Sequence, residues 1–304
     1  MRFANTLVDT VRLPPVALTL VLLTPLLFLG CIPRESGATP ESPNAESART
    51  AAEAASRELT LFAASSLTDV MDAMGAAFSE AFPEVRVVTN YASSSRLAIQ
   101  LTEGAPAELF ASANPRQMER VVESGRIDPE EVITFAHNTL VAIAPAAGDE
   151  GGAAAPDPAG LSEFADIAEP GLSLVLASPA VPVREYTDEM IDAAAAELGG
   201  EFRERFYGNL LSEESNVRQV AARIALGEAD LGVVYATDVT QDIREAVRII
   251  EIPSAYGVSA SYLIAPVENG AEPAAARRFI AFVLAPRGRE ILEEHNFALP
   301  EKES

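Results

Sequence analysis

The chain is poor in the residues on which much metal, nucleophile and nucleotide chemistry depends. Its 304 residues include one cysteine, two histidines, no tryptophan and a single lysine, Lys302. Without other lysines, a P-loop, a Schiff-base lysine and a Ser-x-x-Lys nucleophile are excluded. One cysteine allows no disulfide within the chain, so the fold must depend on its hydrophobic core. The two histidines, His137 and His295, are far apart in the sequence and with one cysteine form no cluster of metal ligands.

Positive charge is also scarce. The chain has 22 Lys and Arg residues against 45 Asp and Glu residues, which gives a formal net charge of -23 and a pI near 4.4. Nucleic acid is therefore not expected as a partner, because phosphate backbones are bound by Lys and Arg. Any anion must be captured locally, against the field of the whole protein. The length and the 48% hydrophobic composition suffice for one large or two medium cores.

The N-terminal residues predict export rather than a folded domain. An apolar stretch, residues 16–29, follows Arg2 and Arg12, is short for a membrane span and is interrupted by Pro25. It leads to Cys31, and residues 1–31 resemble the signal peptide of a bacterial lipoprotein, whose cysteine is lipidated after cleavage. A chance cysteine in an ordinary signal peptide is the alternative. We expect a periplasmic or other extracytoplasmic location in the cell envelope, with a lipid on Cys31 as the only membrane attachment.

Residues 32–57 are rich in Pro, Glu, Ser, Ala and Thr and have almost no large apolar side chains. Such a composition cannot bury enough apolar surface to fold by itself. These residues therefore predict a disordered tether that holds a folded domain away from the membrane.

Two serine clusters stand where a predicted strand leads into a predicted helix. Ser65 and Ser66 follow the apolar run of residues 59–64, and Ser93 to Ser95 follow the valine-rich residues 85–88. A helix N-terminus offers unpaired N–H groups and partial positive charge, so hydroxyl groups there help to hold an anion. Serine is also a common N-cap residue. Plain helix capping and one shared anion site are both open interpretations of these serines.

The rest of the chain continues to alternate strands and helices. Residues 107–112, 172–177 and 230–236 read as buried strands, and residues 185–198 as a helix. Residues 132–145 are a long apolar segment, long enough to pass from one domain to another. This alternation predicts an α/β fold with two mostly parallel sheets flanked by helices.

Five stretches resemble the molybdate-binding proteins of bacterial ABC importers, which are periplasmic binding proteins with two α/β lobes and a hinged cleft. The stretches are residues 62–68 (FAASSLT), 91–95 (YASSS), 103–112 (EGAPAELFAS), 138–141 (NTLV) and 231–235 (LGVVY). The resemblance runs from about residue 59 to residue 300. It implies one lobe of residues 58–138 plus 259–301 and a second lobe of residues 139–258, hinged by crossover strands near Asn138 and Ser259.

In that family, serine hydroxyls, backbone N–H groups and a tyrosine hydroxyl hold a tetrahedral oxyanion without a charged side chain. The resemblance implies a ligand set of Ser66, Ser94, Val183, Val217 and Tyr235, in which the two valines act through their backbone amides. Ser65 and Ser93 are the supporting neighbours. From the sequence alone, Tyr235 also fits a core tyrosine.

Arg184 is the main departure from the family pattern, because a small residue usually stands at its position. It either reaches the cleft as a cation or pairs with Glu185 or Asp188 nearby, and we favour the pairing.

The implied function is that of an extracytoplasmic substrate-binding protein, not an enzyme. It would capture molybdate or tungstate as the oxyanion, without a cofactor and as a monomer, and deliver it to an ABC permease. A receptor for another tetrahedral oxyanion such as sulfate is the alternative within the class. A serine hydrolase is the alternative outside it, but His137 and His295 are the only histidine bases and no Gly-x-Ser-x-Gly elbow occurs.

Overall fold

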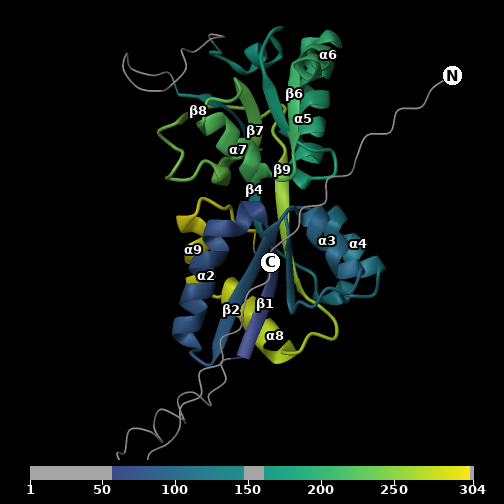
Figure 1. The fold of residues 1–304 in the computed structure, drawn as a ribbon, viewed down its shortest axis with the longest axis vertical. Coiled ribbons are helices and arrows are strands. Elements are labelled where there is room, and N and C mark those ends of the chain that lie inside the picture. Colours follow the sequence, from purple (N-terminus) through teal and green to yellow (C-terminus); the bar gives the residue numbers. More distant parts are fainter. Residues whose placement is uncertain (1–56, 147–160, 302–304) are drawn as a thin grey trace, which may run out of the picture. The chain divides into compact units, whose positions relative to one another are not determined.

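The computed structural model describes residues 57–146 and 161–301 (Figure 1). The predicted signal peptide, its Cys31 and the predicted tether up to residue 56 lie outside the described residues. Of the helices that are described, none has both the length and the apolar character needed to cross a membrane.

The described strands form a nine-stranded sheet in the order β2-β1-β3-β9-β4-β7-β5-β6, with β8 paired to β4. The first strand group has β1 in parallel with β2 and β3, and β9 antiparallel to β3. Its strands are β1 (Arg57–Ala64), β2 (Val85–Ala92), β3 (Leu109–Ser112) and β9 (Ser259–Pro266). Its helices are α2 (Thr68–Ala81), α3 (Ser94–Thr102), α4 (Pro115–Glu123), α8 (Pro273–Leu284) and α9 (Pro286–Glu294).

The second strand group has β5 in parallel with both β6 and β7. Its strands are β5 (Leu174–Ala177), β6 (Leu210–Glu214), β7 (Leu231–Tyr235) and β8 (Val247–Ile250), and its helices are α5 (Pro182–Leu198), α6 (Glu201–Gly208) and α7 (Val217–Ala225). Short 3-10 turns occur at η1 (Ser65–Leu67), η2 (Pro129–Glu131), η3 (Phe164–Ala168) and η4 (Ala236–Asp238).

The long strand β4 (Ile133–Pro145) joins the two strand groups. Its residues 133–139 pair with β9, and its residues 140–145 pair with β7 and β8. All of these pairs are antiparallel, so the sheet is mixed at its centre and parallel toward its outer strands. The apolar segment predicted to pass between domains therefore does pass from one strand group to the other.

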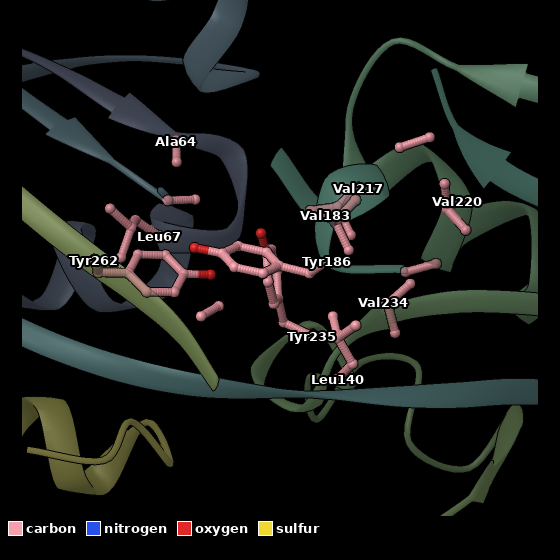
Figure 2. Packing of buried hydrophobic residues seen from close by; sticks show 14 of the residues in the cluster. Ala64, Leu67, Leu140, Val183, Tyr186, Val217, Val220, Val234, Tyr235 and Tyr262 are labelled. Atoms are coloured by element: carbon pink, nitrogen blue, oxygen red, sulfur yellow. The ribbon is translucent and has the colours of Figure 1, made fainter. Parts of the chain in front are cut away.

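The main hydrophobic core includes residues of both strand groups. Where the groups meet, the ring of Tyr235 packs edge to face against Tyr262 of β9 and Tyr186 of α5, with ring centroids 5.7 Å and 6.4 Å away. Figure 2 shows Ala64 and Leu67 on one side of these rings and Val183 and Val217 on the other. Because aromatic pairs in this geometry add to the burial of apolar surface, the tyrosines hold the two groups together.

Two local predictions need correction. Helix α5 begins at Pro182 rather than at residue 185, because proline at the first helical position has the required φ and lacks only an N–H that would be unpaired there. Strand β6 was not expected; it alternates half-buried with exposed residues and carries two glutamates, so it has no apolar run to reveal it.

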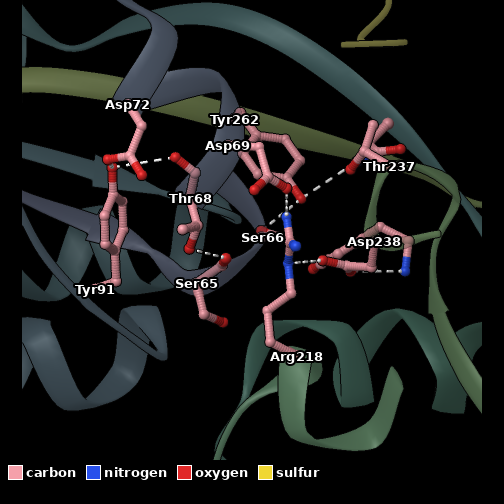
Figure 3. A network of polar contacts seen from close by, with 12 residues as sticks. Ser65, Ser66, Thr68, Asp69, Asp72, Tyr91, Arg218, Thr237, Asp238 and Tyr262 are labelled. Carbon is pink, nitrogen blue, oxygen red and sulfur yellow. Dashed lines mark hydrogen bonds and ion pairs between the residues drawn. The ribbon is translucent and has the colours of Figure 1, made fainter. Parts of the chain in front are cut away.

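An ion-pair cluster links the two strand groups beside Ser66 (Figure 3). Arg218, in the first turn of α7, lies 2.8 Å from a carboxylate oxygen of Asp69 on α2 and 2.8 Å from one of Asp238 in η4. Asp238 is fully buried, and it also accepts a hydrogen bond from the backbone N–H of Tyr235. Burial raises the pKa of Asp238 to about 6, and the charge of Arg218 opposes that rise.

The raised pKa of Asp238 predicts a pH-dependent stability difference between the wild type and Asp238→Asn. An unfolded aspartate titrates near pH ~4, so between about pH 4 and pH 6 the native state binds a proton that the unfolded state does not. The free energy of unfolding of the wild type, relative to the variant, should rise by up to about 3 kcal/mol as the pH falls through this window. Urea unfolding of both proteins from pH 4 to 7 measures the difference; a constant difference would contradict the assignment.

Candidate functional site

A small cavity of about 10 Å³ lies where the two strand groups meet. Residues of both groups line it, and they include all five residues of the implied ligand set. The lining consists of Ala64, Ser65, Ser66, Ser93, Ser94 and Ala113 from the first group and Val181, Pro182, Val183, Val217 and Tyr235 from the second. The fold therefore brings together residues that are up to 171 positions apart, from Ala64 to Tyr235.

A larger cavity, of about 420 Å³, lies next to the small one and shares Ser66 with it. Its walls carry the carboxylates Asp69, Asp242 and Glu294 as well as Arg218 and Arg244. Carboxylates in the wall repel a divalent anion, whereas the small cavity is lined without any acidic side chain. The small cavity is therefore the better candidate site for an anion, although it has the lesser volume.

Ser66 is held in the turn between β1 and α2. It belongs to η1, is 2% exposed, and its Oγ accepts a hydrogen bond of 2.9 Å from the hydroxyl of Tyr262. Neither Ser65 nor Ser66 caps α2 through its side chain, because the N-cap position is Leu67. The Oγ of Ser66 thus accepts from Tyr262 rather than from a helix N–H, and no acceptor for its proton is found among the described residues, so the proton is available to a ligand.

Ser94 is the first residue of α3, directly after the N-cap residue Ser93. Its Oγ accepts a hydrogen bond of 3.0 Å from the backbone N–H of Ala113, so its own proton remains available. The Oγ of Ser93 accepts from the backbone N–H of Arg96 and lies 3.1 Å from the Oγ of Ser95. Ser93 therefore acts as a helix cap, and Ser94 faces the cavity with a free donor.

Val183 and Val217 stand in the first turns of α5 and α7. The N-cap Asn216 accepts a hydrogen bond from Gln219, and the N-cap Val181 has no capping side chain. First-turn N–H groups have no partner within their own helix, and the partial positive charge of a helix N-terminus favours anions. Two helix N-termini therefore converge on the cavity.

Tyr235 ends β7 and is 1% exposed. Its hydroxyl oxygen is buried and has no hydrogen-bond partner among the described residues. Burial raises the pKa of this phenol well above its usual value, so it stays protonated and remains a donor. Because an unpaired buried hydroxyl is destabilising, its presence at the cavity points to a partner that binds there.

Two cationic side chains near the site, Arg184 and Arg218, are paired with carboxylates. Arg184 lies outside the cavity lining; it pairs with Asp188 at 2.8 Å and Glu213 at 2.7 Å and stacks over Tyr207. Arg218 is held by the two aspartates described above. The site thus offers neutral donors: two serine hydroxyls, two helix N-termini and one phenol.

The serines have no histidine base within hydrogen-bonding distance in the described part of the chain. His137 is bonded to Ser261 and bridges to Ala298, and the Nδ1 of His295 lies 2.8 Å from the carbonyl oxygen of Ile291. Activation of a serine nucleophile requires such a base. Within residues 57–146 and 161–301, no group of three or more His, Cys, Asp or Glu residues is arranged to hold a metal ion.

The family of bacterial extracellular solute-binding proteins matches residues 59–298. Molybdate-binding protein ModA of Mycobacterium tuberculosis is 36% identical over 244 residues, which cover 80% of this chain and 85% of that protein.

Two solved structures share the fold. The periplasmic molybdate-binding protein of Azotobacter vinelandii aligns with a TM-score of 0.65 at 20% identity, covering 80% of this chain and all of the other. The sulfate-binding protein SubI of Mycobacterium tuberculosis aligns with a TM-score of 0.68 at 17% identity, covering 81% and 88% of the two chains. Because the family match spans most of the chain and includes every residue of the candidate site, the protein belongs to the bacterial extracellular solute-binding protein family.

Proposed function

We propose that the protein is the substrate-binding component of an ABC importer and that it captures molybdate or tungstate. The observation that carries this proposal is the buried hydroxyl of Tyr235, unpartnered among the described residues, in a cavity lined by hydrogen-bond donors from both strand groups. The close similarity to a molybdate-binding protein over 80% of the chain supports the choice of ligand. The protein is a receptor and not an enzyme.

The donor set suits a fully deprotonated tetrahedral oxyanion. Such an ion has four acceptor oxygens and no proton, so each contact from Ser66, Ser94, Tyr235 or a helix N–H is a charge-assisted hydrogen bond. These bonds are roughly twice as strong as neutral ones. Several of them acting together make a lysine or arginine unnecessary, which fits a protein with a net charge of -23.

Capture also requires the two strand groups to separate and close. The cavity of about 10 Å³ has room for roughly one water molecule, so the ion must enter a more open form. We assign residues 58–138 plus 259–301 to one lobe and residues 139–258 to the other, hinged at β4 and β9. Contacts across the cleft, such as Asn114 with Glu185 at 3.0 Å and Arg218 with Asp69, would form on closure.

The delivery of the ion depends on parts of the chain outside the described residues. Members of this family act outside the cytoplasm, and we propose a signal peptide of residues 1–31, a lipid on Cys31 and a tether of residues 32–57. These would keep a monomeric receptor beside its permease. We expect mass spectrometry of the mature protein purified from a bacterial host to detect a lipid on Cys31. A mature protein without a lipid on this cysteine would contradict the proposed anchor.

Sulfate is the second candidate ligand. A sulfate-binding protein has the same fold as this chain. Sulfate is also a proton-free tetrahedral dianion, so the same donors suit it. Size is then the property that separates it from the larger molybdate and tungstate ions.

Titration calorimetry with a series of oxyanions tests the proposed ligand. We expect molybdate and tungstate to bind with micromolar affinity or better, about -8 kcal/mol or more favourable, and sulfate and phosphate to bind more weakly. Tight binding of sulfate together with weak binding of molybdate would transfer the assignment to sulfate. No binding of any of the four ions would reject an oxyanion receptor.

Ser66→Ala removes one donor from the site. We expect molybdate affinity to fall about tenfold or more, or ~1.5 to 3 kcal/mol, because one charge-assisted bond is lost. Ser79→Ala is the matched control: the Oγ of Ser79 donates to the carbonyl oxygen of Val85 and lies outside the small cavity, so its loss should lower stability by ~1 kcal/mol and leave binding nearly unchanged. Equal affinity of Ser66→Ala and the wild type would assign Ser66 a purely structural role.

Tyr235→Phe should have opposite effects on binding and on stability. Molybdate affinity should fall about tenfold, while the ligand-free protein should become more stable by ~1 kcal/mol, because an unpaired buried hydroxyl is removed. Calorimetry and thermal unfolding without ligand measure the two effects. Tyr186→Phe is the control, since its hydroxyl accepts from the N–H of Ser261 and does not line the cavity. A loss of ligand-free stability in Tyr235→Phe would mean that the hydroxyl has a structural partner.

A further inference from the structure

A chain of hydrogen-bonding side chains runs from the second strand group to Ser66 (Figure 3). The side-chain amide of Asn138, on β4, donates to the Oγ of Thr237 at 2.7 Å and to the hydroxyl oxygen of Tyr262 at 3.4 Å. The hydroxyl of Tyr262, on β9, donates to the Oγ of Ser66 at 2.9 Å. Apart from Thr237, which is half-buried, the members of this chain are at least 97% buried.

The direction of the chain is fixed at Asn138. Its Oδ1 accepts a hydrogen bond of 2.9 Å from the backbone N–H of Thr139. The Nδ2 of the same amide must therefore face Tyr262, and an amide nitrogen can only donate. The oxygen of Tyr262 acts as the acceptor in this contact, and its single proton is directed to Ser66.

Burial keeps Tyr262 in the form that donates. Its side chain is completely buried, and this raises the pKa of the phenol well above its usual value. Asp238 is the nearby acidic group that raises the pKa further, while the hydrogen bonds with Ser66 and Asn138 lower it. At neutral pH Tyr262 is therefore a neutral phenol with one proton to give.

We propose that Tyr262, oriented by Asn138, is a positioning and specificity-determining residue that makes Ser66 a donor toward the bound anion. Since Tyr262 occupies one acceptor position of the Ser66 oxygen, a proton-free anion in the cavity is the natural acceptor for the Ser66 proton. An anion that donates its own proton to Ser66 would leave the Ser66 proton unpaired in a buried place, which is unfavourable. This inference rests on the proposed oxyanion-binding function and names the residues that set its selectivity.

Two substitutions in the full-length protein test the inference. Tyr262→Phe removes the donor, and we expect molybdate affinity to fall about threefold to tenfold because the hydroxyl of Ser66 is no longer held in one orientation. Asn138→Asp replaces a donor by an acceptor of the same shape. The proton of Tyr262 would then turn to residue 138, Ser66 would donate to Tyr262, and a lone pair of Ser66 would face the ligand.

The ratio of molybdate to hydrogen phosphate affinity separates this reversal from plain charge repulsion. At about pH 8 both ions are dianions, but only hydrogen phosphate carries a proton. A new negative charge weakens the binding of both ions alike. Reversal of the hydrogen bonds weakens the binding of molybdate but not that of hydrogen phosphate, because hydrogen phosphate can donate its proton to Ser66. We expect the molybdate to phosphate ratio to fall about tenfold or more in Asn138→Asp. An unchanged ratio in a folded variant would overturn the inference.

A double-mutant cycle with Ser66→Ala shows whether Tyr262 acts through Ser66. Tyr262→Phe should weaken molybdate binding in the wild type and have little further effect in Ser66→Ala. Equal losses in both backgrounds would mean that Tyr262 acts only through packing, and circular dichroism checks that each variant is folded. If the wild type binds none of the oxyanions, the proposed function itself fails; if it binds them and the cycle is additive, this inference alone fails.

Discussion

The structure of the site depends on one constraint: an anion must be bound in a strongly acidic protein by groups that carry no charge. Neutral donors meet this requirement only if they are buried, fixed and free to donate. The two serine hydroxyls therefore have one acceptor position of their oxygen occupied by the protein itself. Ser66 receives the proton of Tyr262, and Ser94 receives the N–H of Ala113. The surrounding fold supplies these hydrogen bonds as well as the cavity.

The same constraint explains why the site lies between two strand groups. One βα corner presents only a few donors in one direction, and four acceptor oxygens of a tetrahedral ion point in four directions. The corners of β1 and β2 provide serine hydroxyls, and those of β5 and β7 provide a helix N-terminus and Tyr235. Two acidic side chains close to the site, Asp69 and Asp238, are paired with Arg218.

Sequence patterns predicted the alternation of strands and helices, the crossover segment and the serine corners because all three are local. The resemblance to a known family added Val183, Val217 and Tyr235, which line the same cavity as Ser66 and Ser94. Tyr262 was missed because its contact with Ser66 spans 196 residues and a tyrosine in an apolar strand looks like core. Strand β6 and the start of α5 were missed because an exposed edge and a proline turn leave weak apolar signals.

The unpaired hydroxyl of Tyr235 connects binding to closure. This buried group has no hydrogen-bond partner among the described protein residues, and an unpaired buried hydroxyl is unfavourable by ~1 to 3 kcal/mol. In the proposed function, a bound oxyanion accepts a hydrogen bond from Tyr235, which removes this penalty, and it also bonds to both strand groups. Differential interaction of a ligand with two states is what shifts their equilibrium. Under the proposed function, Tyr235 therefore favours the closed form only when the oxyanion is bound, and a permease that recognises the closed form accepts the loaded receptor.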